Sequence, residues 1–147
     1  MRRNLLTSVA AVGLLASVAL TASGCAVVDG LVHKQKSAEY TDAAAFAADG
    51  DLDAPWLPAD GTQIRVTRST QADDAVLAAE SGEELDPAVC AEVPRQSAPA
   101  YTLDDTVDVY DLDTVFACGD WTVAKTSDGW LGWTPNHPDE AAQSPTS

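Results

Sequence analysis

The sequence predicts an α+β fold: a small antiparallel sheet of about four to five strands that ends in a tryptophan-rich hairpin, with one short helix before it. Three observations predict this fold class. Residues 63–68 alternate polar and apolar side chains, which is typical of a half-buried strand. Two apolar segments rich in tryptophan flank the turn-forming pair Asp128-Gly129, which indicates a hairpin. Residues 38–49 are rich in alanine and place apolar side chains at helical spacing.

The first 24 residues are predicted to be a secretory signal peptide. Arg2 and Arg3 give a basic start, residues 5–22 carry no charge, and the small residues Ser23 and Gly24 follow. A membrane-spanning helix needs about 20 predominantly apolar residues. The uncharged segment is slightly shorter and contains several polar or small residues, so a cleaved signal is favoured over an uncleaved anchor.

The sequence Ala22-Ser23-Gly24-Cys25 resembles the lipobox of bacterial lipoproteins. The resemblance covers residues 1–25, and Ala22 stands where the motif usually has Leu. It implies that a diacylglycerol is attached to the thiol of Cys25 before cleavage on its N-terminal side. It therefore implies a lipid-anchored protein on the extracytoplasmic face of the cell membrane. The alternative is an ordinary secretory signal that leaves an unmodified Cys25 near the new N-terminus.

Cys90 and Cys118 are the cysteines that remain when Cys25 carries the lipid. An even pair in an exported protein meets an oxidising environment, which predicts a disulfide between them. Two reduced, buried thiols are the alternative. Two cysteines are too few for a structural zinc site, and His33 and His137 lie far from them along the chain.

The net charge of the mature chain limits its partners. Cleavage before Cys25 leaves six basic residues against 23 acidic ones, a formal net charge of −17. Such a surface repels the phosphates of nucleic acids, so we expect no nucleic-acid binding. It favours a basic or cationic partner in the cell envelope. The alternative is that the charge serves only to keep the protein soluble.

The mature chain is expected to contain four regions: a membrane-proximal tether (residues 25–37), a short helix (38–49), a globular α+β domain (50–136) and a disordered tail (137–147). In the helix, Tyr40, Ala43 and Ala47 share one face, and Gly50 is a typical C-terminal stop. The tail is rich in Pro and Ser and shows no periodicity.

Within the globular domain, strands are expected at residues 63–68, 73–79 and 115–118 and in the hairpin. Ile64 and Val66 are expected to point into the core. Pro94 and Pro99 predict that residues 93–102 form a loop.

The loop length of the hairpin decides which side chains share a face. A three-residue loop ending at Gly129 would pair Thr126 with Trp130 and separate the apolar from the polar side chains. The apolar face would then hold Trp121, Val123, Leu131 and Trp133. A two-residue Asp-Gly turn would make both faces strongly apolar. The first register gives the cleaner separation and is therefore predicted.

In that register Trp130 lies on a face rich in Thr and Gly. An exposed tryptophan is a candidate contact for a sugar ring, another small ligand or a partner. The alternative is that Trp130 packs beneath a loop or a terminal segment.

No metal site, cofactor or enzymatic activity is expected. Asp49, Asp51, Asp53 and Asp60 have the spacing of an EF-hand calcium loop, but Ala54 stands where the sharp turn needs Gly. The acidic residues 104–113 are a second, looser calcium candidate. No catalytic motif is found in the sequence.

The order of several short motifs is similar to that in small lipoproteins of actinobacteria: Trp56-Leu57-Pro58, Ile64-Arg65-Val66, Cys90, Cys118, Trp121-Thr122-Val123 and Gly129-Trp130-Leu131-Gly132-Trp133-Thr134-Pro135. This resemblance spans roughly residues 56–135. It implies an exported, disulfide-linked domain and brings no activity with it. We therefore expect a non-enzymatic binding or accessory module of the cell envelope. The alternative is a domain that binds cell-wall glycan or a small ligand through Trp130.

Overall fold

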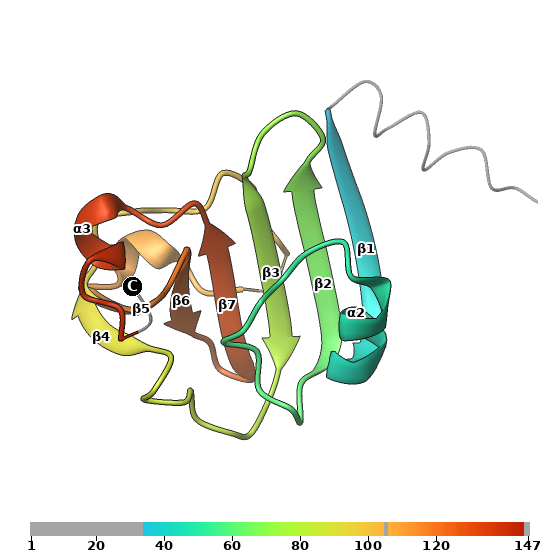
Figure 1. The fold of residues 1–147 in the computed structure, drawn as a ribbon, viewed down its shortest axis with the longest axis horizontal. Helices are drawn as coiled ribbons and strands as arrows, with labels where there is room; N and C mark the ends of the chain where they lie inside the picture. Colours follow the sequence, from blue (N-terminus) through green and yellow to red (C-terminus); the bar gives the residue numbers. More distant parts are fainter. Residues whose placement is uncertain (1–33, 105, 146–147) are drawn as a thin grey trace, which may run out of the picture.

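The computed structural model of the protein describes residues 34–104 and 106–145, and within them seven strands form one antiparallel sheet (Figure 1). The order of the strands across the sheet is β1-β2-β3-β7-β6-β5-β4. The strands are β1 (Gln35–Asp42), β2 (Thr62–Ser69), β3 (Ala75–Glu80), β4 (Ala91–Pro94), β5 (Thr114–Cys118), β6 (Trp121–Lys125) and β7 (Gly129–Thr134). The helical elements are α2 (Ala43–Asp49), the 3₁₀ turn η1 (Val109–Asp111) and α3 (Pro138–Ala141).

The predicted fold class is wrong in the size of the sheet and in what precedes it. The sheet has seven strands rather than four to five, and residues 35–42 form the edge strand β1 instead of tether and helix. Ala38 and Tyr40 lie opposite Val66 and Ile64 of β2, so they fit the period of a strand as well as that of a helix. Only Ala43–Asp49 is helical at this end of the described chain.

The start and the end of α2 follow from local chemistry. Asp42 is the N-cap, and its carboxylate accepts a hydrogen bond of 2.8 Å from the backbone N–H of Ala45. Gly50 ends the helix with a φ of 66°, as its position in the sequence predicts.

The expected loop at residues 93–102 begins too early. Ala91–Pro94 forms β4, which pairs with β5 and is the second edge of the sheet. Pro94 is the last residue of this edge strand, where its missing N–H is tolerated. The prediction that Ile64 and Val66 are buried on β2 is confirmed.

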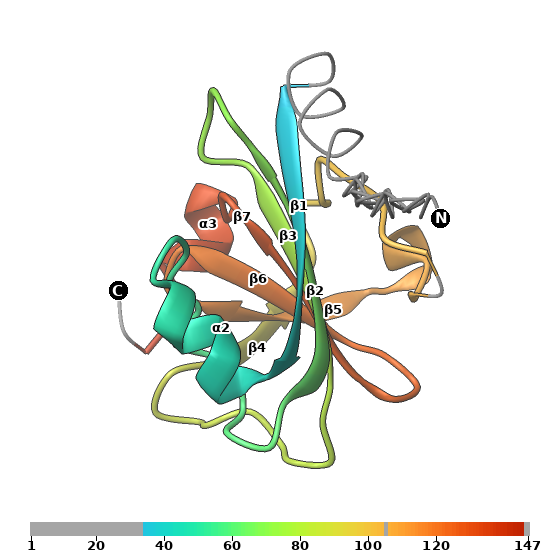
Figure 2. The same cartoon turned by 90° about the vertical axis from the view of Figure 1, so that its right-hand side faces the viewer.

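Both faces of the sheet are covered, and each face has its own hydrophobic cluster. The cluster on the α2 side includes Phe46, Trp56, Ile64, Leu77, Trp121 and Trp130. The cluster on the other side includes Val76, Val115, Leu131 and Trp133, and it lies beneath the segment between β4 and β5. Figure 2 shows α2 and the β4–β5 segment on opposite sides of the sheet.

This two-sided burial explains why the predicted hairpin register is wrong. Lys125 lies opposite Trp130, and the N–H of Thr126 donates to the carbonyl of Gly129 at 2.9 Å, so Ser127 and Asp128 form a two-residue turn. Trp121 and Trp130 therefore share one face, while Leu131 and Trp133 share the other. The prediction assumed one polar face, and this sheet has none at the hairpin.

The disulfide between Cys90 and Cys118 is present and lies in the cluster on the α2 side. It joins the segment before β4 to the end of β5 across a sequence separation of 28. Closing a loop of this length contributes about 3–4 kcal/mol to the free energy of unfolding in the chain-entropy model.

The C-terminal segment contains a helix where a disordered tail was predicted. α3 begins with Pro138 after its N-cap residue His137, and Glu140 in its middle is completely buried. The prediction of disorder is therefore wrong for this part of residues 137–147.

Residues 1–33 lie outside the described residues, so the signal peptide, the lipid on Cys25 and most of the tether stay predictions. Within residues 34–104 and 106–145, no helix has the length and apolar character needed to cross a bilayer.

Candidate functional site

The described part of the segment between β4 and β5, residues 95–104 and 106–113, forms the outer layer on one face of the sheet, and we call it the β4–β5 loop. Several of its apolar side chains are partly buried against the cluster beneath: Ala98, Tyr101, Leu103, Val107 and Leu112. Tyr110 in η1 differs from them, because 72% of its surface is exposed. It is the single exposed large hydrophobic side chain among the residues that the structure describes.

Two arginines fix the path of the β4–β5 loop. Arg65 on β2 donates from Nη1 to the carbonyl of Asp104 at 2.9 Å. Arg95 donates from Nε to the carbonyl of Leu112 at 3.0 Å and from Nη1 to that of Ser97 at 3.2 Å. These hydrogen bonds hold the loop backbone against the sheet, so the side chains that it presents have defined positions.

Tyr110 is itself held in place. Asp108 caps η1, and its carboxylate accepts a hydrogen bond of 3.0 Å from the backbone N–H of Tyr110. The guanidinium carbon of Arg95 lies 5.6 Å from the centre of the tyrosine ring, within the range of a cation–π contact. The ring is thus oriented while most of its surface meets solvent.

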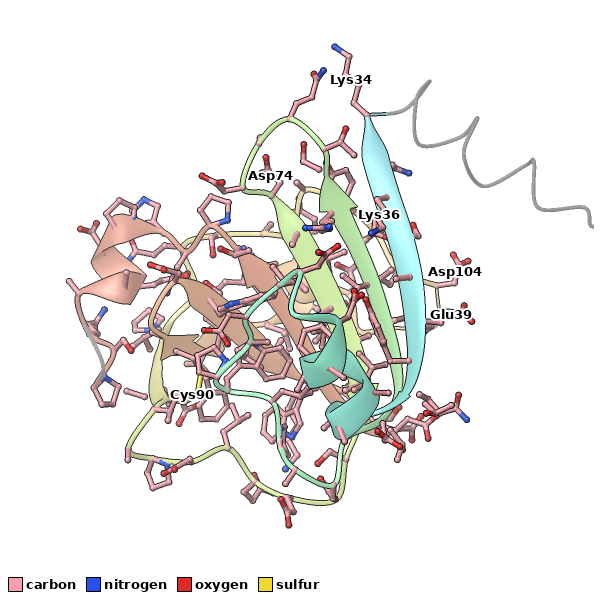
Figure 3. All side chains as sticks on the ribbon, turned by 45° about the vertical axis from the view of Figure 1, so that its right-hand side comes forward. Lys34, Lys36, Glu39, Asp74, Cys90 and Asp104 are labelled. Carbon is pink, nitrogen blue, oxygen red and sulfur yellow. A yellow bond between two sulfur atoms is a disulfide. The ribbon has the colours of Figure 1, made fainter. Side chains whose placement is uncertain are left out.

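Carboxylates surround this tyrosine along the chain. The exposed acidic residues of the β4–β5 loop include Asp104, Asp108, Asp111 and Asp113. None of the ion pairs found among the described residues uses these four carboxylates. Figure 3 shows Asp104 near Glu39 of β1, which adds to the negative charge beside the loop.

Cavities border the β4–β5 loop on several sides. One of about 490 Å³ lies between the loop and Leu131. A second, of about 540 Å³, lies between residues 100–104 and the strands β1 and β2. A third, of about 260 Å³, lies beside Thr106, and Arg65 lines both the second and the third. The loop is therefore bordered by concave surface on several sides.

Trp130, the ligand contact suggested by the sequence, is buried, with an exposed fraction of 1%. Its indole N–H donates to the carbonyl of Glu83 at 3.0 Å, and the Phe116 ring packs edge-on at a centroid distance of 5.7 Å. The hypothesis that Trp130 contacts a ligand is contradicted, because the register of the hairpin directs the side chain into the core.

The acidic residues of the EF-hand-like segment do not converge on one point. Asp49 accepts a hydrogen bond of 2.5 Å from the hydroxyl of Tyr40, which raises the pKa of Tyr40 to about 12. Asp60 accepts from the backbone N–H of Gly82 at 2.9 Å and from the hydroxyl of Ser81, and the Ser81 bond is the main reason that the pKa of Asp60 is lowered.

Asp51 has a third environment. Lys36 donates to its carboxylate at 3.0 Å and Arg68 at 2.6 Å, and the Lys36 bond is the largest cause of a lowered pKa for Asp51. Among residues 34–104 and 106–145, no three His, Cys, Asp or Glu side chains are arranged to hold a metal ion.

A buried polar cluster around Glu140 was missed by the sequence analysis. The carboxylate accepts hydrogen bonds from the hydroxyls of Ser97 (2.8 Å) and Thr122 (2.6 Å), and Ser97 accepts one from the indole N–H of Trp133 (2.9 Å). Asn136 lies 2.8 Å from the Thr122 hydroxyl and donates to two backbone carbonyls. These contacts attach α3 to the sheet. A single Glu in a segment rich in Pro gave no signal of this role.

Comparisons of the chain with protein-family models, with curated proteins and with solved structures gave no match in any of the three cases. Among the residues that the structure describes, the β4–β5 loop with Tyr110 is the best-defined candidate surface.

Proposed function

We propose that this protein is a membrane-anchored extracytoplasmic lipoprotein that acts as a non-enzymatic binding module of the cell envelope. Its partner is a protein with a basic surface, and the contact is made by the β4–β5 loop. The observation that carries this proposal is Tyr110, a fixed and largely exposed aromatic side chain in a loop that also presents exposed carboxylates.

The chemistry of this surface favours a protein partner. Tyrosine is enriched among the side chains that contribute most to protein interfaces, because it offers a large apolar ring and a hydroxyl at low entropic cost. Carboxylates at the rim attract a basic partner and accelerate the encounter, and this attraction weakens as salt is added. The strongly acidic composition of the chain also favours a positively charged partner.

The anchor is the part of the proposal that rests on the sequence alone. When cells are grown with an alkyne-tagged fatty acid, we expect the protein to take up the label and Cys25→Ala to lose it. The double variant Cys90→Ala/Cys118→Ala is the matched control. It should keep the label, because it retains Cys25 at the predicted signal cleavage site. An unlabelled wild-type protein would contradict the anchor.

The binding surface is tested by placing a photo-reactive amino acid at position 110 in the full-length protein in its own envelope. We expect an adduct with a protein partner whose yield falls at least threefold when ionic strength rises from about 0.05 M to about 0.5 M, because the Debye length shortens. The same probe at Gln71, an exposed residue of the β2–β3 turn, should give little of this adduct.

Once the partner is identified, Tyr110→Ala is expected to weaken its binding at least tenfold, and Tyr110→Phe much less, because the ring is retained. Equal adduct yields from positions 110 and 71, or an unchanged affinity of Tyr110→Ala, would show that the β4–β5 loop is not the interface.

A further inference from the structure

Among residues 34–104 and 106–145, no strand pairs with the outer edge of β1. β1 is the first strand in the order of the sheet, and no described element crosses its outer side in Figure 2, which looks onto this edge. The strand is eight residues long, contains no Pro and pairs with β2 without a bulge. Long, regular edges of this kind are sites where another strand can add, and natural proteins usually protect them.

The backbone groups that face outward follow from the pairing with β2. The N–H of Thr70 donates to the carbonyl of Lys34, so the even-numbered residues of β1 turn their N–H and C=O groups toward β2. The groups of Gln35, Ser37, Glu39 and Thr41 therefore point away from the sheet. They form a row of donors and acceptors at the spacing that an antiparallel strand requires.

We propose that β1 pairs with β1 of a second copy of this chain, antiparallel and about a two-fold axis at Ala38. An isologous two-fold contact requires a self-complementary strand, and this register provides one. Ala38 would lie opposite Ala38, and Asp42 at the end of each strand would lie opposite Lys34, the residue that precedes β1. Ser37 would lie opposite Glu39, Lys36 opposite Tyr40, and Gln35 opposite Thr41.

The neighbouring registers are less favourable. An axis at Glu39 would place the two Glu39 carboxylates opposite each other, and like charges in that position are destabilising. An axis at Ser37 would place Lys34 opposite Tyr40 and lose both Lys34–Asp42 contacts. Ala38 at the axis also suits the close approach, because residues of a non-hydrogen-bonded pair have Cα atoms about 4.5 Å apart. Figure 3 shows Lys36 and Glu39 along this strand and Lys34 just before it.

The contact uses residues of β1 and extends the sheet across two copies. It does not depend on the proposed partner at Tyr110, so the two proposals can fail separately.

The test is oxidative cross-linking of the full-length protein in membranes. Ala38→Cys is expected to form a disulfide-linked dimer on mild oxidation, because the two new thiols face each other at the axis. Ser37→Cys is the matched control: its thiol would lie diagonal to its own copy, with Cα atoms about 7–8 Å apart, and should give at least fivefold less dimer. The parental chain, with Cys25, Cys90 and Cys118 unchanged, sets the background.

Two further substitutions, each combined with Ala38→Cys, distinguish strand pairing from cross-linking by random collision. Glu39→Pro removes one outward N–H while leaving the hydrogen bonds to β2, and we expect it to reduce the dimer at least fivefold. Lys34→Glu places like charges opposite each other and should reduce the dimer as well. Circular dichroism of both variants should match the parent. The proposal would be overturned by equal yields of cross-linked dimer from Ala38→Cys and Ser37→Cys. It would also be overturned if adding Glu39→Pro to Ala38→Cys left the dimer yield unchanged.

Discussion

Gly129→Ala is expected to lower the free energy of unfolding by about 3 kcal/mol or more, because position 129 has no room for a side chain. A Cβ atom there would lie 2.2 Å from the carbonyl oxygen of Ala79 and 2.7 Å from the backbone nitrogen of Ser81. Both atoms belong to the backbone, so neither can rotate away as the end of a side chain would. The strands β3 and β7 would have to separate at the pair Glu80 and Gly129.

The cost is large because of where this pair lies. The β3–β7 pairing is the junction between the β1-β2-β3 part of the sheet and the β7-β6-β5-β4 part. Beside it, the N–H of Ser81 donates to the carbonyl of Asp128 at 3.0 Å, and each backbone hydrogen bond lost costs about 1 kcal/mol.

Gly82→Ala is the matched control for this substitution. A Cβ at Gly82 would meet the carboxylate of Asp60 at 3.7 Å, which is an ordinary van der Waals contact. We expect it to change the free energy of unfolding by less than about 1 kcal/mol. Urea denaturation followed by tryptophan fluorescence measures both variants. If Gly129→Ala and Gly82→Ala lay within 1 kcal/mol of each other, the close approach of β7 to β3 would be contradicted.

Glu140→Ala is expected to cost about 3–5 kcal/mol, because it removes the acceptor of several buried or half-buried donors. One carboxylate oxygen accepts from the backbone N–H groups of Gln96 and Ser97, and the other from the hydroxyls of Ser97 and Thr122. Glu140 has no exposed surface, so water does not replace these bonds without a rearrangement of α3.

Glu140→Gln separates the loss of hydrogen bonds from the loss of shape. The amide keeps an oxygen for the two backbone donors, and its nitrogen meets two hydroxyls that can turn to accept. We therefore expect a cost of about 1–2 kcal/mol. Hydrogen exchange at Gln96 and Ser97 should rise in Glu140→Ala and stay near the wild-type rate in Glu140→Gln. Trp133 gives a second readout, because its indole N–H donates to Ser97. Equal effects of the two variants would show that the hydrogen bonds do not anchor α3.

The sequence predicts those parts of the fold whose local pattern of side chains fits only one type of secondary structure. Ile64 and Val66 alternate with polar neighbours on β2 and are buried, and the cysteine pair forms its bridge. The pattern of the segment before Gly50 fits both a helix and a strand. Ala38 and Tyr40 fit a helical face with the alanines that follow, and they also fit the period of a strand. The pairing with β2, which is distant in sequence, decides for the strand.

The predicted register of the hairpin is wrong for a different physical reason. A sheet with one solvated face separates polar from apolar side chains, and that rule favoured the wrong pairing. Here the segment around Trp56 covers one face, where a Cβ on Gly132 would meet the Trp56 ring at 2.3 Å, and the β4–β5 loop covers the other. Neither covering layer has a periodic pattern, so the sequence gives no sign that both faces of the hairpin are buried.

The residues of the candidate site also depend on contacts that the sequence pattern does not reveal. The predicted register placed Trp130 on a face rich in Thr and Gly, where it could be exposed. The side chain is buried, and Tyr110 is the exposed large aromatic residue among those that the structure describes. A single tyrosine in an acidic loop is common in sequences. What distinguishes Tyr110 is the cap at Asp108 and the guanidinium of Arg95 beside its ring, and these contacts appear only in three dimensions.

The position of β7 has a consequence for how the chain matures. Among the strands that the structure describes, β7 comes last along the chain, yet it is the fourth of seven across the sheet. A nascent polypeptide that stops short of Gly129 has two incomplete half-sheets and no element to join them. Stable tertiary structure must therefore await the residues of β7, which keeps the emerging polypeptide in a loosely structured state until that strand has been made.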